Sequence, residues 1–359
     1  MLRKASPRLF TDKVMQKRTR NILIGSFLAI ILLACAIGGA FYYYFMAPQF
    51  FPPQTTYVYI DRDDTADSVY VKVEEVGHVK DFHGFKWMSE YRHYPESIRT
   101  GRYEIRNGES VYHVFSRIWR GYQTPMNITI NSARTMKRLA GQVGRQLMID
   151  SVEIATLMYD SAFQAKMGYT KETMPALFIP DTYEMYWDIS VDEFFDRMKT
   201  EHKRFWNTSR TAKAKEMGLT ENEVATLASI VEEETNNNPE KPTVAGLYYN
   251  RLRIGMPLQA DPTIKFALQE FGIRRILNSD LNVESPYNTY LHKGLPPGPI
   301  RIPSVTGLDA VLNYAHHNYL YMCAKEDFSG THNFAVTYRE HVNNAQRYWA
   351  ALNKRKIKR

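Results

Sequence analysis

Cysteine is nearly absent from this sequence, because only Cys35 and Cys323 occur among 359 residues. So few thiols exclude a disulfide scaffold and a cysteine-rich zinc site. Glycine and proline show no excess, at 19 and 17 residues, which excludes a collagen-like or low-complexity chain. Long hydrophobic runs are scarce as well. A single run near the N-terminus excludes a multi-span membrane protein.

Negative charge is scarce at both ends of the chain. Residues 1–20 carry a net charge of +6, and residues 354–359 carry +5. The formal net charge of the whole chain is +8, so the remaining residues sum to −3. Because the basic residues lie in two tails and the body is slightly acidic, the composition does not predict a nucleic-acid-binding surface. We therefore expect no nucleic acid among the partners.

The one long uncharged run covers residues 22–46 (ILIGSFLAIILLACAIGGAFYYYFM). Its length is enough to cross the hydrocarbon core of a bilayer, and the tyrosines near its end suit the membrane interface. Because the basic residues precede it, residues 1–21 should stay in the cytoplasm and the body should cross. A cleaved signal peptide or a lipid-modified Cys35 would be followed by polar sequence, whereas the apolar run continues past Cys35.

The body after the membrane segment divides into several parts by its sequence pattern. Residues 47–56 are proline-rich, which predicts an extended stalk. Residues 57–130 predict a small α/β module, and residues 131–353 predict a larger domain with many helical patterns. The expected class is therefore α+β, with one membrane helix, a small module and a mixed domain. In the small module, alternation predicts strands at Tyr57, Tyr59, Val69, Val71 and Val73.

One predicted helix ends in a run of acidic residues. Thr220 and Glu223 form a capping-box pattern, and the following helix reads VATLASIVEEET at 224–235. Glu232 and Glu234 fall on the two flanks of its apolar stripe, and Glu233 points to the opposite side. A carboxylate at the edge of an apolar stripe is partly desolvated, which raises its pKa and suits a general acid. The alternative is a solvated acidic helix end, which is common on protein surfaces.

Six ordered blocks lie along residues 178–341. They are FIPDTY at 178–183, ASIVEEET at 228–235, YNRL with GMPLQADPT at 249–263, SPYNTY at 285–290, GLPPGPI at 294–300, and GTHNF with a later histidine at 330–341. These blocks resemble the endolytic murein transglycosylases, the YceG-like family. Residues 57–130 resemble the LysM-like domain of that family. The sequence departs from the family at residues 131–134 (NSAR), where a Glu-Gly pair is usual.

The resemblance implies a peptidoglycan lytic transglycosylase, which is a carbon–oxygen lyase that needs no cofactor. Such an enzyme cleaves the MurNAc–GlcNAc bond without water, because the 6-hydroxyl of the muramic ring attacks its own anomeric carbon. The products carry 1,6-anhydroMurNAc ends, and cutting nascent strands internally terminates their elongation. By the same resemblance Glu232 serves as the single acid and base. The implied partners are glycan strands, peptidoglycan synthases and the bacterial inner membrane, with the catalytic domain periplasmic or extracytoplasmic.

Five further residues are candidates for holding the sugars. Amides and carboxylates hydrogen-bond sugar hydroxyls and N-acetyl groups, and a tyrosine can both stack and donate. Asp261 could instead cap a helix at 263–270, and Asn288 could satisfy backbone groups of its loop. The five candidates are Glu234, Gln259, Asp261, Asn288 and Tyr290.

A metal site is not expected. His332 and His341 lie near Asp327, but their spacing does not match a zinc signature. Cys323 is interpreted as a buried strand residue.

Two other functions use the same residues. The chain could be a non-catalytic peptidoglycan-binding scaffold of a wall-synthesis complex, or a hydrolase in which Glu234 or Asp261 is a second carboxylate beside Glu232. Glu232 and Glu234 lie two positions apart on opposite flanks of one helix, which is awkward for a pair acting across one bond. The ends that are released distinguish the three functions. A transglycosylase releases anhydro ends, a hydrolase releases reducing ends, and a scaffold releases none.

Overall fold

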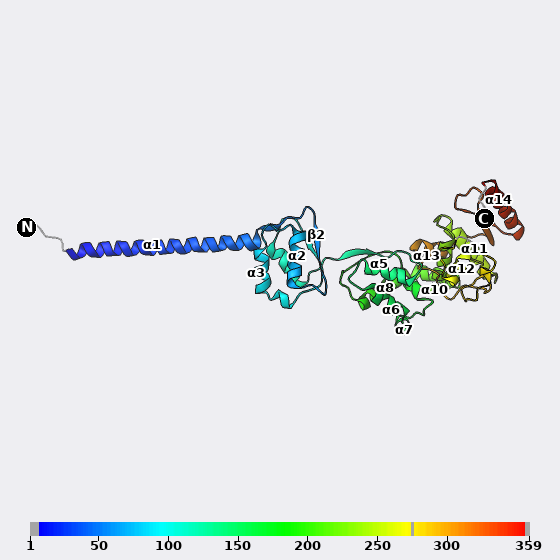
Figure 1. The fold of residues 1–359 in the computed structure, drawn as a ribbon, viewed down its shortest axis with the longest axis horizontal. Coiled ribbons are helices and arrows are strands. Elements are labelled where there is room, and N and C mark those ends of the chain that lie inside the picture. Colours follow the sequence, from blue (N-terminus) through cyan, green and yellow to red (C-terminus); the bar gives the residue numbers. More distant parts are fainter. Residues whose placement is uncertain (1–6, 274–275, 356–359) are drawn as a thin grey trace, which may run out of the picture. The chain divides into compact units, whose positions relative to one another are not determined.

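The computed structural model describes residues 7–273 and 276–355. The chain forms two units, Met1–Pro125 and Met126–Arg359. Both units contain helices together with a few short antiparallel strands (Figure 1). The predicted α+β class with one long apolar N-terminal helix is therefore confirmed.

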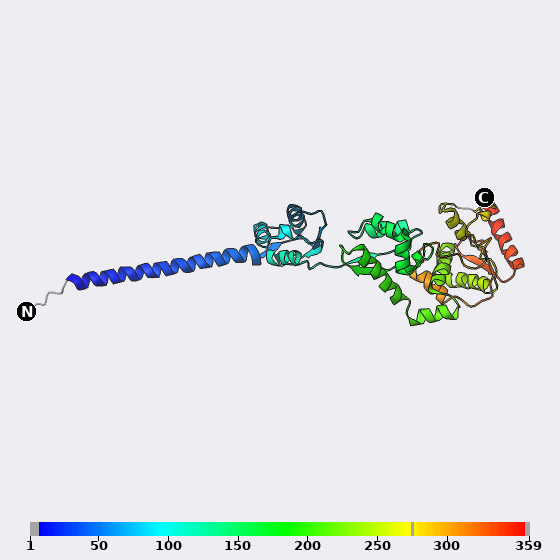
Figure 2. The same cartoon turned by 90° about the horizontal axis from the view of Figure 1, so that it is seen from below.

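The first unit begins with α1 (Pro7–Phe41), the blue helix of Figures 1 and 2, which continues into a π-helical turn at Tyr42–Met46. The stretch Met15–Met46 is long and apolar enough to cross a membrane, and its most apolar window is entirely exposed. An apolar helix that packs against nothing is not the core helix of a soluble domain. It includes the whole of the uncharged run predicted from the sequence.

Three helices and two small antiparallel sheets complete the first unit. Strand β1 pairs with β4, and β2 pairs with β3, with Val58 opposite Tyr103. Large buried side chains such as Phe85, Phe115 and Tyr94 form its core. The elements are β1 (Pro48–Phe50), β2 (Thr56–Ile60), α2 (Ala66–Gly77), α3 (His83–Tyr91), a 3₁₀ turn (Tyr94–Glu96), β3 (Gly101–Ile105), β4 (Glu109–Ser110) and α4 (Val111–Arg120).

The predicted stalk at residues 47–56 is wrong. This segment is folded into the first unit, because β1 pairs with β4 and Phe50 is fully buried in the core. Gln49 is buried too, and its side-chain amide donates to the Tyr43 carbonyl at 2.7 Å. The prolines suggested an extended chain, but Phe50, which lies between Pro48 and Pro52, is buried in the core. The first unit therefore follows the apolar helix without a spacer.

The strand predicted through Val69, Val71 and Val73 is also wrong, because these residues lie in α2. Thr65 and Ser68 form a capping box that begins the helix. Val69 and Val73 are one helical turn apart and both buried, whereas Val71 is exposed. Local capping therefore outweighs the strand preference of valine.

The second unit is built from ten helices and four short strands among the described residues, and β5 begins it. Because β5 pairs with β6, residues 126–130 belong to this unit and not to the small module of 57–130. The elements are β5 (Met126–Thr129), α5 (Met136–Gly144), α6 (Ser151–Tyr159), α7 (Ser161–Met167), β6 (Thr182–Met185), α8 (Val191–Phe205), α9 (Thr208–Glu216), α10 (Glu221–Glu234), α11 (Lys241–Arg253), α12 (Asp261–Leu268), α13 (Val305–Leu312), β7 (Tyr321–Ala324), β8 (His332–Ala335) and α14 (Tyr338–Lys354), with 3₁₀ turns at Met174–Leu177 and Asp280–Asn282.

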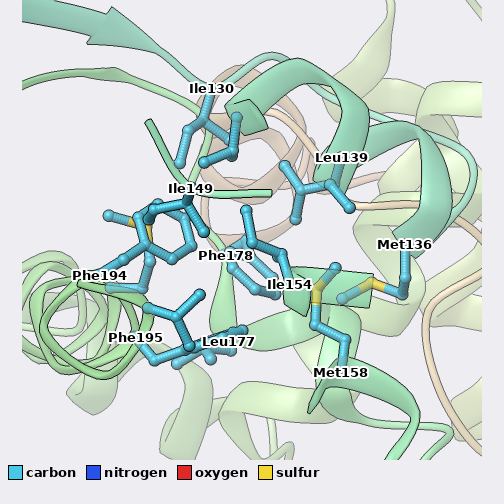
Figure 3. Close-up of a cluster of buried hydrophobic side chains, with 14 of the residues drawn as sticks. Ile130, Met136, Leu139, Ile149, Ile154, Met158, Leu177, Phe178, Phe194 and Phe195 are labelled. Atoms are coloured by element: carbon cyan, nitrogen blue, oxygen red, sulfur yellow. The ribbon is translucent and has the colours of Figure 1, made fainter. Parts of the chain in front are cut away.

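Two hydrophobic cores lie inside the second unit. The first gathers side chains from α5, α6, α8 and the loop before β6, including Leu139, Ile154 and Phe194 (Figure 3). The second surrounds α10 and takes side chains from α11 and α13. Residues 300–304, which we call the connecting segment, join them, because Ile300 is buried in the second core and Ile302 in the first.

The packing of β1 leads to a prediction for two neighbouring phenylalanines. Phe50→Ala should lower the free energy of unfolding of the first unit by about 3–5 kcal/mol, because it empties a fully buried position. Phe51→Ala, at a side chain that is 43% exposed, should change it by no more than about 0.5 kcal/mol. Hydrogen exchange of core amides in the full chain in detergent micelles measures both. Equal changes in the free energy of unfolding for the two variants would instead indicate that residues 47–56 form a flexible stalk.

Candidate active site

Helix α10 carries the predicted acidic residues and lies in the middle of the second core. Thr220 caps it and Glu223 closes the capping box, as the sequence predicts. All eight residues from 224 to 231 are buried, so the helix is enclosed on every side and not only along one stripe. Its last turn leaves the core as Glu232, Glu233 and Glu234. Successive residues are rotated by about 100°, so the three carboxylates point in three directions.

Glu232 faces the start of α13. Its Oε2 accepts a hydrogen bond from the Ser304 backbone N–H at 2.7 Å. A Cβ placed on Gly307 would lie 2.8 Å from the same oxygen, so a side chain at position 307 would displace this carboxylate from its present position. Glu232 remains partly exposed. One oxygen of the carboxylate is therefore fixed by the backbone.

Glu233 is held by two arginines. Arg134 donates to both carboxylate oxygens at 2.8 Å, and Arg301 donates to Oε1 at 2.7 Å. Arg301 also donates to the Ser132 hydroxyl, which in turn donates to the Ile302 carbonyl. Charge-assisted bidentate pairs of this kind fix geometry strongly. Arg301, Ser132 and Arg134 thus link the connecting segment to Glu233 at the end of α10.

Glu234 faces α11 and α12. The Tyr248 hydroxyl donates to its Oε1 at 2.7 Å. Burial raises the pKa of Glu234 to about 7, against the lowering effect of that hydrogen bond, and the nearby charge of Asp261 raises it further. The expected rise in pKa is therefore found at Glu234, which lies on the opposite side of the helix from Glu232.

The other candidate residues form one loop cluster. The Tyr290 hydroxyl donates to Asp261 Oδ1 at 2.5 Å, and Asn288 Oδ1 accepts from the Tyr290 backbone N–H at 3.0 Å. Gln259 is exposed and its backbone N–H donates to the Thr289 carbonyl at 3.0 Å. Its φ of 51° lies in the left-handed region, which is strained for a residue other than glycine and is typical of functional loops. The cluster thus presents the side chain of Gln259 and the bonded pair of Asp261 and Tyr290.

Two of the sequence alternatives are decided by this cluster. Asp261 does not cap a helix with its side chain, because α12 begins at Asp261 itself and has no side-chain cap hydrogen bond. Asn288 is fully buried and donates to the carbonyls of Leu281 and Val283, both at 2.9 Å. It therefore satisfies loop backbone groups and holds Tyr290 in place.

The structure brings Glu234, Asp261 and Tyr290 into electrostatic contact, and it places Glu232 on the α13 side of α10. Sequence reasoning missed Ser304, Arg301 and Tyr248, which are the partners of the three acids. Arg301 directly follows the GLPPGPI block at 294–300. No sequence pattern links these partners to α10, because they lie 14 to 72 positions away from the acids they contact.

The histidines near the C-terminus have separate roles. His332 Nδ1 and its backbone N–H contact Glu240, at 2.9 and 2.7 Å, and His341 stacks against Tyr321. Asp327 pairs with Lys325. Among the described residues, these side chains do not gather into a group of metal ligands.

A cavity of about 410 Å³ lies where the two cores of the second unit meet. Arg134 and Arg301 line it together with Lys171, and Tyr159 and Tyr287 supply aromatic surface. Glu172 lines the pocket as well, so its wall carries both the arginines that hold Glu233 and an acidic side chain. It is lined by the connecting segment, whose Ser304 contacts Glu232.

Comparison with known proteins places this site in a family, since the family model described as YceG-like matches residues 58–347. The chain belongs to the YceG-like family. The match begins within β2 and ends within α14, so it includes most of the folded part of the first unit and most of the second unit.

Relatives in the YceG-like family agree with this assignment. A Bacillus subtilis protein named endolytic murein transglycosylase is 25% identical over 293 residues, which cover 77% of this chain and 80% of the relative. A Streptococcus pneumoniae D39 protein of the same name is 28% identical over 338 residues, covering 83% of this chain and 60% of the relative. The chain thus spans about three fifths of the pneumococcal protein's length.

A crystal structure of a putative YceG-like protein from Listeria monocytogenes has the same fold. It superposes with a TM-score of 0.54 at 23% identity, covering 81% of this chain and 99% of that chain.

The raised pKa of Glu234 leads to a prediction about stability and pH. The folded chain holds this proton up to about pH 7, whereas the ordinary value is 4.5. The contribution of Glu234 to the free energy of unfolding is therefore full below about pH 4.5 and is lost as the pH rises through 7. The difference of 2.5 pKa values corresponds to about 3 kcal/mol.

Glu234→Gln removes this titration and keeps an acceptor for Tyr248. Denaturant unfolding should show the variant more stable than wild type at pH 8, by up to about 3 kcal/mol, and nearly equal to it at pH 4.5. Glu233→Gln is the matched control, because it loses ion pairs and should be destabilised at both pH values. A difference between wild type and Glu234→Gln that is the same at the two pH values would contradict the assignment.

Proposed function

We propose that this chain is an endolytic lytic transglycosylase that cuts peptidoglycan glycan strands and leaves 1,6-anhydroMurNAc ends. The observation that carries the proposal is the YceG-like match over residues 58–347, together with relatives named endolytic murein transglycosylase. The chemistry of the last turn of α10 supports it. That turn offers a partly exposed carboxylate, Glu232, with one oxygen fixed by the backbone.

Glu232 is the proposed acid and base. Because an N–H donates to Oε2, the proton of the acid form belongs on Oε1. That proton passes to the GlcNAc oxygen as the bond from this oxygen to the muramic C1 breaks. The 6-hydroxyl oxygen of the muramic ring then bonds to C1, and its proton returns to Glu232. No water enters, and the carboxylate ends the cycle in the form in which it began.

The loop cluster is the proposed sugar-binding side of the site. Gln259 is exposed and offers both donor and acceptor atoms, and the pair of Asp261 and Tyr290 offers a carboxylate oxygen beside an aromatic ring. Glu234 lies close enough to this cluster for the charge of Asp261 to act on it, and it accepts a hydrogen bond from the Tyr248 hydroxyl. Asn288 acts by holding the backbone of Tyr290.

A two-carboxylate hydrolase is the less favoured function. In such an enzyme the second carboxylate must face the same bond as the first. Glu232 contacts the start of α13, whereas Glu234 contacts α11 and lies near Asp261. This arrangement supports one acid at the bond and a separate acidic group behind the loop cluster.

We further propose that the protein is a single-pass inner-membrane protein, with its N-terminus cytoplasmic and both folded parts outside. The exposed apolar helix and the +6 charge that precedes it support this topology. The proposal extends to a LysM-like role for the first unit and to peptidoglycan synthases as partners, since nascent strands emerge from those enzymes at the membrane.

The proposed chemistry predicts the nature of the released ends. Full-length protein in detergent, incubated with un-crosslinked glycan strands, should release anhydro-muramic ends that mass spectrometry identifies. Glu232→Gln should reduce their release by about 100-fold or more, because general acid and base assistance from one group is lost. Reducing ends would instead indicate a hydrolase. Bound but uncleaved strands would indicate a scaffold.

A further inference from the structure

The apolar helix leads directly into the folded part of the first unit, and its length fixes where that part begins. A hydrocarbon core about 30 Å thick takes about 20 helical residues at 1.5 Å each. Counted from Ile22, the first residue of the uncharged run, the core ends near Phe41. The π-helical turn Tyr42–Met46 then lies at the level of the lipid headgroups. Whatever packs on this turn lies at the same level.

Helix α3 packs on this turn. A Cβ placed on Gly84 would lie 2.3 Å from the Tyr44 carbonyl oxygen, so the two backbones are in direct contact. The inner face of α3 packs into the core of the first unit, where Phe85 and Met88 are buried. The outer face carries Trp87, which is 54% exposed, and Tyr91, which is 64% exposed.

Four aromatic side chains form a continuous row from α1 to α3. Ring centroids are 5.1 Å apart for Phe41 and Phe45, 5.2 Å for Phe45 and Trp87, and 5.1 Å for Trp87 and Tyr91. The aromatic row, as we call these four residues, thus begins at the end of the membrane-spanning run and continues along the exposed face of α3. The Arg92 guanidinium lies over the Tyr91 ring at 5.7 Å.

We propose that α3 lies in the headgroup region of the same bilayer that α1 crosses, with the aromatic row in contact with lipid. The proposal rests on α1 crossing the membrane. Tryptophan and tyrosine favour this region because their rings are amphipathic. Exposed Arg92 lies at the Tyr91 end of the row, and cations at this level meet lipid phosphates. The first unit therefore rests on the membrane surface.

Exposed aromatic rings also stack on sugars, so a glycan-binding row is the competing outcome. Two observations favour lipid. The row is continuous with the apolar helix, and Trp87 and Tyr91 stack on each other with planes only 8° apart. One face of each ring is therefore already covered by the other, which reduces the surface available to a sugar ring.

Spin labels in the full chain test the proposal. Cys35→Ala and Cys323→Ala remove the native thiols, and Tyr91→Cys then places one label on the row. Val71→Cys on α2 is the matched control, because Val71 is 63% exposed and lies outside the row. In nanodiscs containing anionic lipid, the ratio of collisions with oxygen to collisions with a water-soluble nickel chelate should be severalfold higher at position 91 than at position 71.

Equal, water-like ratios at both positions would overturn the proposal. Recovery of the chain with the nanodiscs reports the α1 anchor separately, and neither reading depends on strand cleavage. Tryptophan emission gives a second test that leaves Tyr91 intact. Lipids brominated near the headgroup should quench part of the emission, and this part should disappear in Trp87→Phe but persist in Trp349→Phe. Tryptophan emission that changes with soluble GlcNAc oligomers and not with brominated lipid would indicate that the aromatic row binds sugars and not lipid.

Discussion

The rotation of about 100° per residue at the end of α10 is the constraint on which the rest of the site depends. It gives three consecutive carboxylates three different surroundings. Three acids at a helix C-terminus oppose the helix dipole, so each needs its own compensation. Glu232 receives a backbone N–H, Glu233 receives two guanidinium groups, and Glu234 keeps its proton up to about pH 7. The same repeat of one residue type thus yields the proposed catalytic carboxylate, a structural anchor and an acid with a raised pKa.

The connecting segment explains why these surroundings persist. The Ile300 N–H donates to the Ser229 hydroxyl on α10, and the Ile302 N–H donates to the Ala133 carbonyl at the start of the other core. Two residues farther on, Ser304 reaches Glu232. Because one short stretch of backbone is bonded to both cores and to the proposed catalytic residue, a shift between the cores would move Glu232. The ion pairs of Glu233 resist that shift.

Sequence patterns predicted the parts of this arrangement that depend on local spacing. The capping box at Thr220 follows from residues within one turn of the helix. Glu233 does lie away from Glu232 and Glu234, but its side chain is only 12% exposed because Arg134 and Arg301 cover it. The partners could not be predicted in that way, since Arg301 lies 68 positions from Glu233 and folds beside it only through the long-range packing of two cores. The errors have a similar cause. The prolines around Phe50 suggested a stalk and the valines of α2 suggested a strand, but burial and capping decide both.

The most direct test of separate roles is the initial rate of strand cleavage at one pH for Glu232→Gln, Glu233→Gln and Glu234→Gln, with folding of each variant checked by circular dichroism. The account predicts that only Glu232→Gln abolishes cleavage while it keeps wild-type stability. It predicts that Glu233→Gln is the least stable of the three, and that Glu234→Gln still cleaves. Loss of cleavage in a folded Glu234→Gln chain, with activity retained in Glu232→Gln, would contradict the assignment of the acid.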